Sequence, residues 1–414
     1  MAVLLRLGHS KLSPCGAITG LCKSVKKTSV NINQIAWITG KALRDDRPPR
    51  PAPFDWKNKS YAFWHVWTDA MIERMDDNSK IVIVEGLPAV GKEKFAMQLA
   101  DELEMLYMPT PTFDDYHIDP TGFDYRTFNP KLPDDAKFYD DKMFHANPKG
   151  LLSASIQMGY YFLRFSAYID ALTHVLSTGQ GVVLQRSPWS DVVFAKSMLT
   201  QGYMSPGAYD YYKSSLANSL HRLLRPHLVI YLDIPAEKSL ENIMKRGRPH
   251  EKNSKGVTLN FLKDVENNYK KIHLPTIASH AHMLIYDWSE EGEMDFVIDD
   301  IESLKFEGYG REDSKMEDWR FSSIDWMRAY RDIYHNQKME LMQTMIISRL
   351  DVPELLMSAK SIDIFRELQD ELFEKRPGSK WADGYDPATN NIWFKTTFSR
   401  ESYPSRAKLI EGSK

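Results

Sequence analysis

The sequence predicts an α/β fold, namely a P-loop-type three-layer sandwich with a five-stranded parallel sheet, plus an N-terminal arm and a C-terminal extension. Short apolar runs recur along the middle of the chain, amphipathic helical stretches separate them, and a glycine-rich loop joins one run to a helix. With 43% hydrophobic and 26% charged residues, the composition is that of an ordinary globular protein, which excludes collagen, extended disorder and a coiled-coil rod.

The expected strands are short apolar runs that are uninterrupted rather than alternating. Such runs are typical of strands buried on both faces of a parallel sheet. The helices between them show apolar residues at every fourth position, as at Phe95, Leu99 and Leu103. The five expected strands are Ile81–Val84, Leu106–Met108, Val182–Leu184, Leu228–Leu232 and Met283–Tyr286.

Residues 1–44 have the composition of a mitochondrial transit peptide. They contain seven Lys or Arg and seven Ser or Thr, but no Asp or Glu. The alternatives are a merely basic arm or a secretory signal, which lacks its compact apolar core here. Both cysteines, Cys15 and Cys22, lie in this leader. A mature chain without it would have no disulfide, thiolate zinc site, cysteine nucleophile or iron–sulfur cluster of its own.

Three further segments follow the leader. Residues 45–79 read as an extended, proline-rich arm and a short helix, whose aromatic stripe, including Trp64 and Trp67, is expected to pack against the core. Residues 80–304 form the predicted α/β domain. Residues 305–414 lose the strand pattern and are rich in Trp, Tyr and charge, so we expect an extension that clasps the core or a partner.

Charge and hydropathy exclude several function classes. No run of about 18 apolar residues occurs, so no transmembrane segment is expected. The net charge is −3, and −10 without residues 1–44, which argues against a nucleic-acid partner. The histidines show no metal-ligand spacing and no Ser-His-Asp set stands out, so we expect no metal site.

A phosphate-binding loop is the strongest motif. Gly86 to Lys92 reads GLPAVGK, which matches GxxxxGK between a strand and a helix. The glycines allow backbone amides to turn toward a phosphate, and the helix N-terminus adds positive potential. Gly86, Gly91 and Lys92 are therefore expected to bind phosphate. The next residue, Glu93, replaces the usual Ser or Thr that coordinates Mg²⁺, so the usual metal geometry is expected to be disturbed.

Downstream of the loop, the stretch VLQRSPWSD at 183–191 resembles the deoxynucleoside kinases, in which a strand ends in Glu-Arg-Ser followed by Asp. The resemblance covers roughly residues 80–290. The chain resembles more closely one branch of that superfamily, the kinase-like accessory subunits of respiratory complex I (NADH:ubiquinone oxidoreductase). The stretches STGQGVVLQRSPWSD, PHLVIYLDIP and SKWADGYDPATNNIWFK carry this closer resemblance, and the last lies in a tail that true kinases lack.

The resemblance implies a retained nucleotide pocket. Gln157 matches the glutamine that reads the Watson–Crick edge of the base, and Arg164 and Asp191 match its supporting partners. The RGRPHE stretch matches the lid, whose arginines clamp phosphates and whose glutamate contacts the sugar. The expected nucleotide-binding residues are Gly86, Gly91, Lys92, Gln157, Arg164, Arg186, Asp191, Arg246, Arg248 and Glu251.

The same resemblance implies lost catalysis at three positions. Thr110 stands where the family places its general-base Glu, and Gln185 stands where the Glu of Glu-Arg-Ser helps to organise Mg²⁺. Glu93 is the third departure. An amide neither takes a proton near neutral pH nor brings charge to a metal, and loss of a general base alone costs about 10²–10⁴ in rate. Asp114 and Asp115 are the candidates for a displaced carboxylate.

Two main functions are therefore weighed. The favoured hypothesis is a non-catalytic accessory subunit of mitochondrial complex I on the matrix face of the inner membrane. Its partners would be other complex I subunits, and it would have no required cofactor, no FAD and no iron–sulfur cluster, with a purine nucleotide or deoxynucleotide as an optional ligand. The alternative is an active mitochondrial deoxynucleoside kinase, and a third possibility is a free matrix nucleotide sensor.

Overall fold

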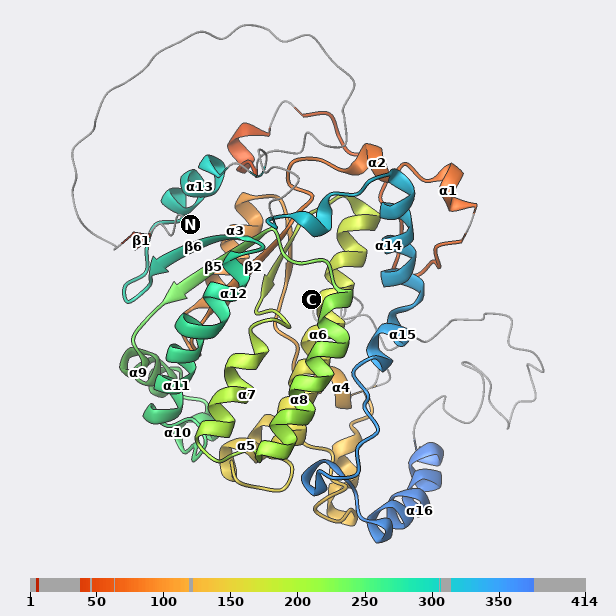
Figure 1. Ribbon diagram of the computed structural model, residues 1–414, viewed down its shortest axis with the longest axis vertical. Helices are drawn as coiled ribbons and strands as arrows, with labels where there is room; N and C mark the ends of the chain where they lie inside the picture. The colour runs from red at the N-terminus through yellow and green to blue at the C-terminus, as the bar shows by residue number, and fades with distance from the viewer. Residues whose placement is uncertain are drawn as a thin grey trace, which may run out of the picture.

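A parallel β-sheet forms the centre of the molecule (Figure 1). The computed structural model describes residues 5–6, 38–44, 47–62, 64–118, 122–304, 306 and 314–375. The strand order is β1-β6-β5-β2-β4-β3, and every pairing is parallel. The strands are β1 (Leu5–Arg6), β2 (Ile81–Gly86), β3 (Leu106–Met108), β4 (Val182–Gln185), β5 (Leu228–Asp233) and β6 (His282–Asp287).

The five predicted strands are confirmed, because β2 to β6 each contain or coincide with an expected apolar run within a residue or so. The two-residue β1 forms the edge of the sheet beside β6 and was not predicted. Strand β2 lies at the centre, with Val84 opposite Gln185 of β4 and Gly86 opposite Leu232 of β5. The carboxyl ends of β2, β4 and β5 therefore meet at one edge of the sheet, where the phosphate loop begins.

The helices surround this sheet, and the long helix α6 is the largest of them (Figure 1). Their bounds are α1 (His65–Thr68), α2 (Met71–Arg74), α3 (Lys92–Glu102), α4 (Asp114–His117), α5 (Asp141–Ala146), α6 (Ser153–Thr178), α7 (Asp191–Thr200), α8 (Pro206–Ser219), α9 (Ala236–Arg246), α10 (Pro249–Lys252), α11 (Leu259–Asn268), α12 (Leu274–Ala278), α13 (Met294–Ser303), α14 (Ile324–Asn336), α15 (Lys338–Gln343) and α16 (Ala359–Lys375).

Alternate residues of the central strand pack into different apolar clusters, which gives the three layers. Val82 and Val84 join a cluster with residues of α3 and α13. Ile81 and Ile83 join a second cluster with residues of α6, α14 and α15. All four side chains are fully buried, as expected for a parallel sheet covered on both faces. The predicted three-layer sandwich is confirmed.

Residues 38–44, which fall within the predicted transit peptide, pack against the α/β domain. Ile38 is fully buried. The backbone N–H of Gly40 donates to Glu302 at 2.7 Å. The guanidinium of Arg44 is buried and pairs with Asp76 and Glu104, both at 2.8 Å. Apart from the strand at 5–6, residues 1–37 lie outside the described residues, and so do both cysteines.

The predicted short helix at 60–76 is two one-turn helices, α1 and α2. The expectation that its aromatic stripe packs is wrong for two members, because Trp64 is 52% exposed and Trp67 is 77% exposed. Met71 is buried as expected. The third aromatic residue of the stripe, Phe63, lies outside the described residues. Hydrophobic spacing alone cannot show whether a short helix finds a surface to cover.

The C-terminal extension is helical where it is described, and α14 and α15 pack along α6 (Figure 1). A buried ion pair joins the extension to the arm. The fully buried Arg331 of α14 pairs with Asp69, lies over the rings of Phe54 and Tyr61, and donates from Nε to Ser177 Oγ at 3.2 Å. The arm, the extension and the end of α6 thus form one packed unit, as expected of an extension that clasps the core.

The rest of the tail, residues 376–414, lies outside the described residues. No helix in the described part of the chain is both long enough and apolar enough to cross a lipid bilayer.

Candidate nucleotide site

The phosphate loop sits between the end of β2 and the start of α3. Gly86 and Gly91 both have left-handed φ values, +144° and +94°. At Gly86 an added Cβ would lie 2.6 Å from the backbone oxygen of Leu232 on β5, so only glycine fits there. Helix α9 holds the loop from outside, because Ser239 Oγ donates to the Pro88 oxygen at 2.7 Å. The predicted strand–loop–helix context is therefore present.

Lys92, the first residue of α3, is buried under this loop. Its Nζ donates to the backbone oxygens of Gly86 at 3.0 Å and Leu87 at 2.5 Å. Burial lowers the pKa of Lys92 well below its ordinary value, and the nearby charge of Arg186 lowers it further. An anion bound at the loop would relieve both effects, because it would supply the opposite charge that the loop carbonyls supply only in part.

The structure brings the predicted base-reading residues together. Gln157 and Arg164 project from α6, and Asp191 is the first residue of α7. Gln157 Nε2 donates to Asp191 Oδ2 at 2.7 Å, and Arg164 forms an ion pair with Asp191 Oδ1. Tyr212 Oη also donates to Asp191 Oδ2, at 3.0 Å. All four side chains are buried, so these residues form one connected polar cluster rather than separate solvated groups.

Two arginines, Arg186 and Arg164, give positive charge to this part of the candidate site. Arg186 is the first residue after β4, and its φ of +60° is unusual for a residue other than glycine. Its guanidinium lies over the Phe194 ring, 4.1 Å from the centroid. Burial lowers the pKa of Arg164 to about 10, with Arg186 as the second cause. Arg164 therefore stays protonated near neutral pH but gains from a nearby anion.

The predicted lid residues lie at the C-terminus of α9 and in α10. Arg246 makes a two-point contact with Glu251, with Nε at 3.0 Å and Nη2 at 2.7 Å. Arg248 lies 3.6 Å from the same carboxylate and is half exposed. Gly247 ends α9 with φ +77°. The lid charges thus form an internal cluster, in which Glu251 orients both arginines.

The two altered catalytic positions contact one another. Thr110 follows β3, and Gln185 ends the neighbouring strand β4. Thr110 Oγ1 donates to Gln185 Oε1 at 2.9 Å, and Gln185 Nε2 donates to Tyr107 Oη at 2.5 Å. This arrangement is an uncharged hydrogen-bonded chain at the place where the family resemblance implies two carboxylates. Neither group takes up a proton near neutral pH.

The other acidic candidates are held elsewhere. Glu93 is exposed on the first turn of α3. Asp114 pairs with Arg126 at 2.7 Å, and Asp115 accepts from the Thr112 backbone N–H at 2.7 Å. These contacts hold Asp114 and Asp115 in the α4 region, and neither contact places a carboxylate beside Lys92 or Gln185.

Sequence reasoning missed Glu85, a fully buried carboxylate directly before Gly86. It accepts from Ser187 Oγ at 2.9 Å and from Tyr269 Oη at 3.1 Å. Its charge opposes the lowering of the Lys92 pKa. The signal was available, because an acidic residue ends an otherwise apolar strand next to the phosphate loop, where a buried charge needs partners.

The residues present fit a nucleotide better than they fit a catalytic Mg²⁺. Buried Lys92, with the neighbouring Arg186, supplies charge for phosphates, and Gln157, supported by Arg164 and Asp191, supplies an amide for a base. Magnesium is bound by oxygen ligands and favours carboxylates. At the positions that resemble its site, the chain offers an exposed Glu93 and an amide already bonded to Tyr107 and Thr110.

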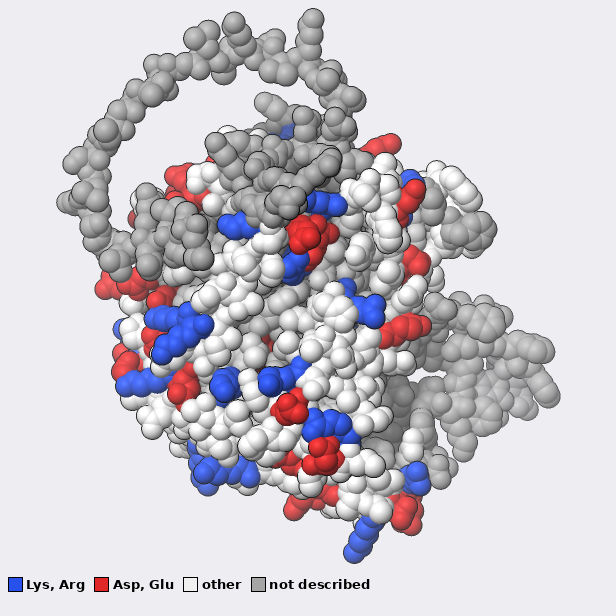
Figure 2. Space-filling view, in the orientation of Figure 1, with Lys and Arg blue, Asp and Glu red and all other residues white. Residues whose placement is uncertain are grey.

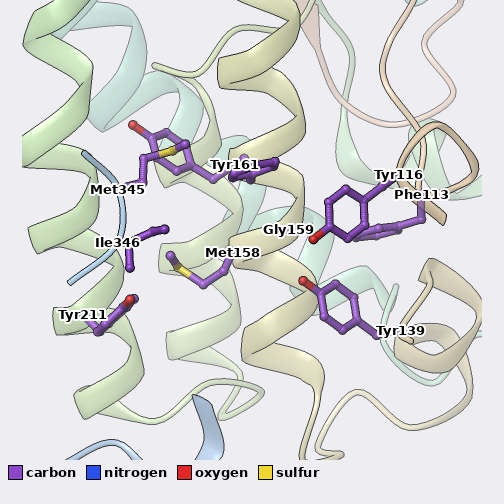
Figure 3. A pocket seen from close by; sticks show the side chains of 10 residues that line it. Phe113, Tyr116, Tyr139, Met158, Gly159, Tyr161, Tyr211, Met345 and Ile346 are labelled. Carbon is purple, nitrogen blue, oxygen red and sulfur yellow. The ribbon is translucent and has the colours of Figure 1, made fainter. Parts of the chain in front are cut away.

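A separate hollow of about 170 Å³ lies on another face of α6, between that helix, α8 and the extension. Figure 3 shows Phe113, Tyr116 and Tyr139 on one side of it and Tyr211, Met345 and Ile346 on the other. Its lining is aromatic and aliphatic and includes none of the predicted nucleotide-binding residues.

The chain was compared with known proteins. The deoxynucleoside kinase family model matches residues 82–305. A mouse protein, NADH dehydrogenase [ubiquinone] 1 alpha subcomplex subunit 10, mitochondrial, is 33% identical over 78% of this chain and 86% of its own length. A deoxyguanosine kinase from Dictyostelium discoideum is 27% identical over 56% of this chain and 72% of its own.

Among solved structures, a deoxyadenosine kinase from M. mycoides with bound dATP aligns with a TM-score of 0.40. It is 17% identical, and the alignment covers 54% of this chain and 96% of that one.

Proposed function

We propose that this chain is a non-catalytic accessory subunit of mitochondrial complex I. It belongs to the deoxynucleoside kinase family and, within that family, to the complex I alpha subcomplex subunit 10 proteins. The observation that carries the proposal is the pairing of Thr110 with Gln185 beside the intact cluster of Gln157, Arg164 and Asp191. The chain keeps residues suited to binding a nucleotide, but at Thr110 and Gln185 it has no carboxylate for phosphoryl transfer.

The pocket of this subunit would hold a purine nucleotide or deoxynucleotide as a structural ligand. Such a ligand would neutralise the charges of Lys92, Arg186 and Arg164. Besides burial, the charges of both arginines lower the pKa of Lys92, and that of Arg186 lowers the pKa of Arg164. By mass action, a ligand that binds only the folded state stabilises it, by about 2.7 kcal/mol at 100 times its dissociation constant. Its role would therefore be stability of the subunit, not turnover.

The chain would lie on the matrix face of the inner membrane with other complex I subunits as partners. The mouse relative named as a mitochondrial NADH dehydrogenase subunit supports the mitochondrial location and these partners. Removal of the leader before Ile38 would keep the contacts of residues 38–44, including both ion pairs of Arg44. Figure 2 shows acidic and basic side chains interspersed on the visible face, without a broad basic patch, which fits a protein partner better than nucleic acid.

Native electrophoresis of detergent-solubilised mitochondria tests the proposed assembly. We expect the chain to co-migrate with the respiratory complex and to shift with it when a complex I core subunit is depleted. A soluble matrix enzyme in the same extract serves as the control that stays at its own mass. Migration of most of the chain as a free protein would contradict this function and favour a nucleotide sensor or an independent enzyme.

One observation favours the second candidate, an active mitochondrial deoxynucleoside kinase. Glu85 is a carboxylate at the start of the phosphate loop, and its charge acts on Lys92. A phosphoryl-transfer assay with purified chain, ATP, Mg²⁺ and each of the four deoxyribonucleosides separates the candidates. We expect no turnover above background, whereas rates of about 1–100 s⁻¹, the kinase range, would establish the enzyme.

A further inference from the structure

Three side chains that are far apart in the sequence meet beside the lid. Asp141 and His145 lie four residues apart on α5, so they share one face of that helix. His250 comes from α10, the short helix that follows the lid glycine Gly247. One ligand atom from each of the three residues lies within 4.8 Å of the others. Figure 1 shows α5 and α10 side by side at the same end of the molecule.

The nitrogen atoms of this cluster are arranged for a metal ion. His145 Nδ1 is 2.7 Å from Ser254 Oγ, a contact that holds the ring and makes Nε2 the ring nitrogen available to a metal ion. His250 Nε2 is shielded from solvent, has no hydrogen-bond partner among the described residues, and lies 3.9 Å from Asp141 Oδ2.

We propose that Asp141, His145 and His250 form a site for a zinc-like divalent ion that clamps the lid segment 246–252 to α5. Two imidazoles and one carboxylate are a ligand set typical of Zn²⁺, with bonds of about 2.0–2.2 Å and water in the fourth position. Ligand atoms around such an ion are about 3.3 Å apart. Small side-chain rotations at the partly exposed Asp141 and His250 supply the required closure.

The proposed metal site would restrict the movement of the lid segment. The chain just after this segment is already tied to α5 by the backbone, because Lys255 N–H donates to the His145 oxygen at 2.9 Å. A metal bond to His250 would fix α10, and with it Glu251, which orients Arg246 and Arg248. The site uses none of the predicted nucleotide-binding side chains, so it stands independently of the proposed function.

Metal binding is tested with the untagged full chain in which Cys15→Ser and Cys22→Ser remove the thiolates. After EDTA treatment and dialysis, Zn²⁺ is titrated in competition with a chromogenic chelator, and Co²⁺ is added to record its visible absorption. We expect one Zn²⁺ per chain and the intense Co²⁺ bands of a tetrahedral site. The variants His250→Gln, His145→Asn and Asp141→Asn each remove one ligand.

Each ligand variant is expected to weaken Zn²⁺ binding by more than the roughly 10–100-fold that loss of an outer partner costs, and Ser254→Ala by about that amount. The matched control is His221→Gln, which replaces an exposed histidine away from the site. Equal Zn²⁺ affinity in wild type, His250→Gln and His221→Gln would overturn the site.

Hydrogen exchange tests the clamp itself. With Zn²⁺ bound, the amides of residues 246–256 are expected to exchange at least about tenfold more slowly, and the His250→Gln variant should show no such protection. Stoichiometric Zn²⁺ binding that leaves exchange in this segment unchanged would overturn the clamp.

Discussion

The two ends of the proposed nucleotide site differ in how their polar side chains are paired. At the base-reading end, Arg164 and Asp191 are a buried ion pair completed by Gln157. At the phosphate-transfer end, Thr110 and Gln185 form a neutral hydrogen bond. Removing one partner of a buried ion pair strands a charge and is strongly destabilising, whereas a neutral hydrogen-bonded pair can replace charges at little cost. A fold can therefore lose its catalytic acids more easily than its binding charges.

The charged residues kept at the two ends of the site do not all have the same role. Arg164 and Asp191 have a structural role whether or not a ligand binds, because their ion pair joins α6 to α7. Lys92 is the opposite case. Its buried charge opposes folding, since burial lowers its pKa, and its loop partners are neutral carbonyls. Its presence is thus better explained by an anion than by stability, and substitutions at the two places should separate structure from binding.

The largest effect is expected for Asp191→Asn. The isosteric change leaves Arg164 buried without a counter-charge, so the free energy of unfolding should fall by about 3–5 kcal/mol in a chemical denaturation experiment. The matched control is Asp210→Asn, which removes an exposed partner of Arg349 at 3.0 Å and should cost no more than about 1 kcal/mol. Similar losses in the two variants would remove the distinction between the two ends of the pocket.

Lys92→Met should change stability and binding in opposite directions. We expect an unfolding free energy equal to or above that of wild type, because a disfavoured buried charge is removed. Affinity for a purine nucleoside triphosphate, measured by calorimetry, should fall about 10–150-fold, which corresponds to the 1.5–3 kcal/mol of a charged hydrogen bond.

Lys94→Met, on the exposed side of the same turn and paired with Glu291, is the control that should leave the affinity unchanged. A clear loss of stability in Lys92→Met without any loss of affinity would show that Lys92 is structural, and it would remove the main argument for a bound nucleotide.

The sequence predicts features set by local patterns, but not contacts that depend on how strands pack. The strands, the phosphate loop and the long helix carrying Gln157 and Arg164 follow from local patterns, because apolar runs and glycine spacing act over a few residues. The meeting of Thr110 with Gln185 depends on β3 lying next to β4, which no local pattern reports. The resemblance to kinases identified the altered positions, but only the packed strands show that they bond to each other.

Burial of individual side chains was the less predictable part. Trp64 and Trp67 have the spacing of a packed stripe, yet both are exposed, at the start and within the single turn of α1. His250 and Asp141 are 109 positions apart, so the spacing of histidines in the sequence gave no sign of their meeting. Glu85 is the exception, because its position at the end of a buried strand implies buried hydrogen-bond partners.

The substitution Gln185→Glu restores a carboxylate at one of the two altered catalytic positions. Both neighbouring hydroxyls, of Thr110 and Tyr107, can donate to a carboxylate, so the unfolding free energy should change by no more than about 1 kcal/mol. We expect no deoxynucleoside phosphorylation, because Thr110 still supplies no general base. The exposed Gln98→Glu on α3 is the control for added charge. Turnover regained by Gln185→Glu alone would show that one carboxylate was all that the site lacked.

The smallest effect is expected for Glu93→Ser, which restores the hydroxyl usual in phosphate loops. The exposed carboxylate lies on the first helical turn of α3, where it interacts favourably with the helix dipole, so its loss should lower stability by about 0.3–1 kcal/mol. Solvent and salt screen its repulsion of a phosphate, so nucleotide affinity should rise no more than about fivefold, close to 1 kcal/mol. A Mg²⁺-dependent rise well beyond that range would mean that Glu93 alone blocks an otherwise complete metal site, and the neutral pair of Thr110 and Gln185 would then no longer explain the proposed loss of catalysis.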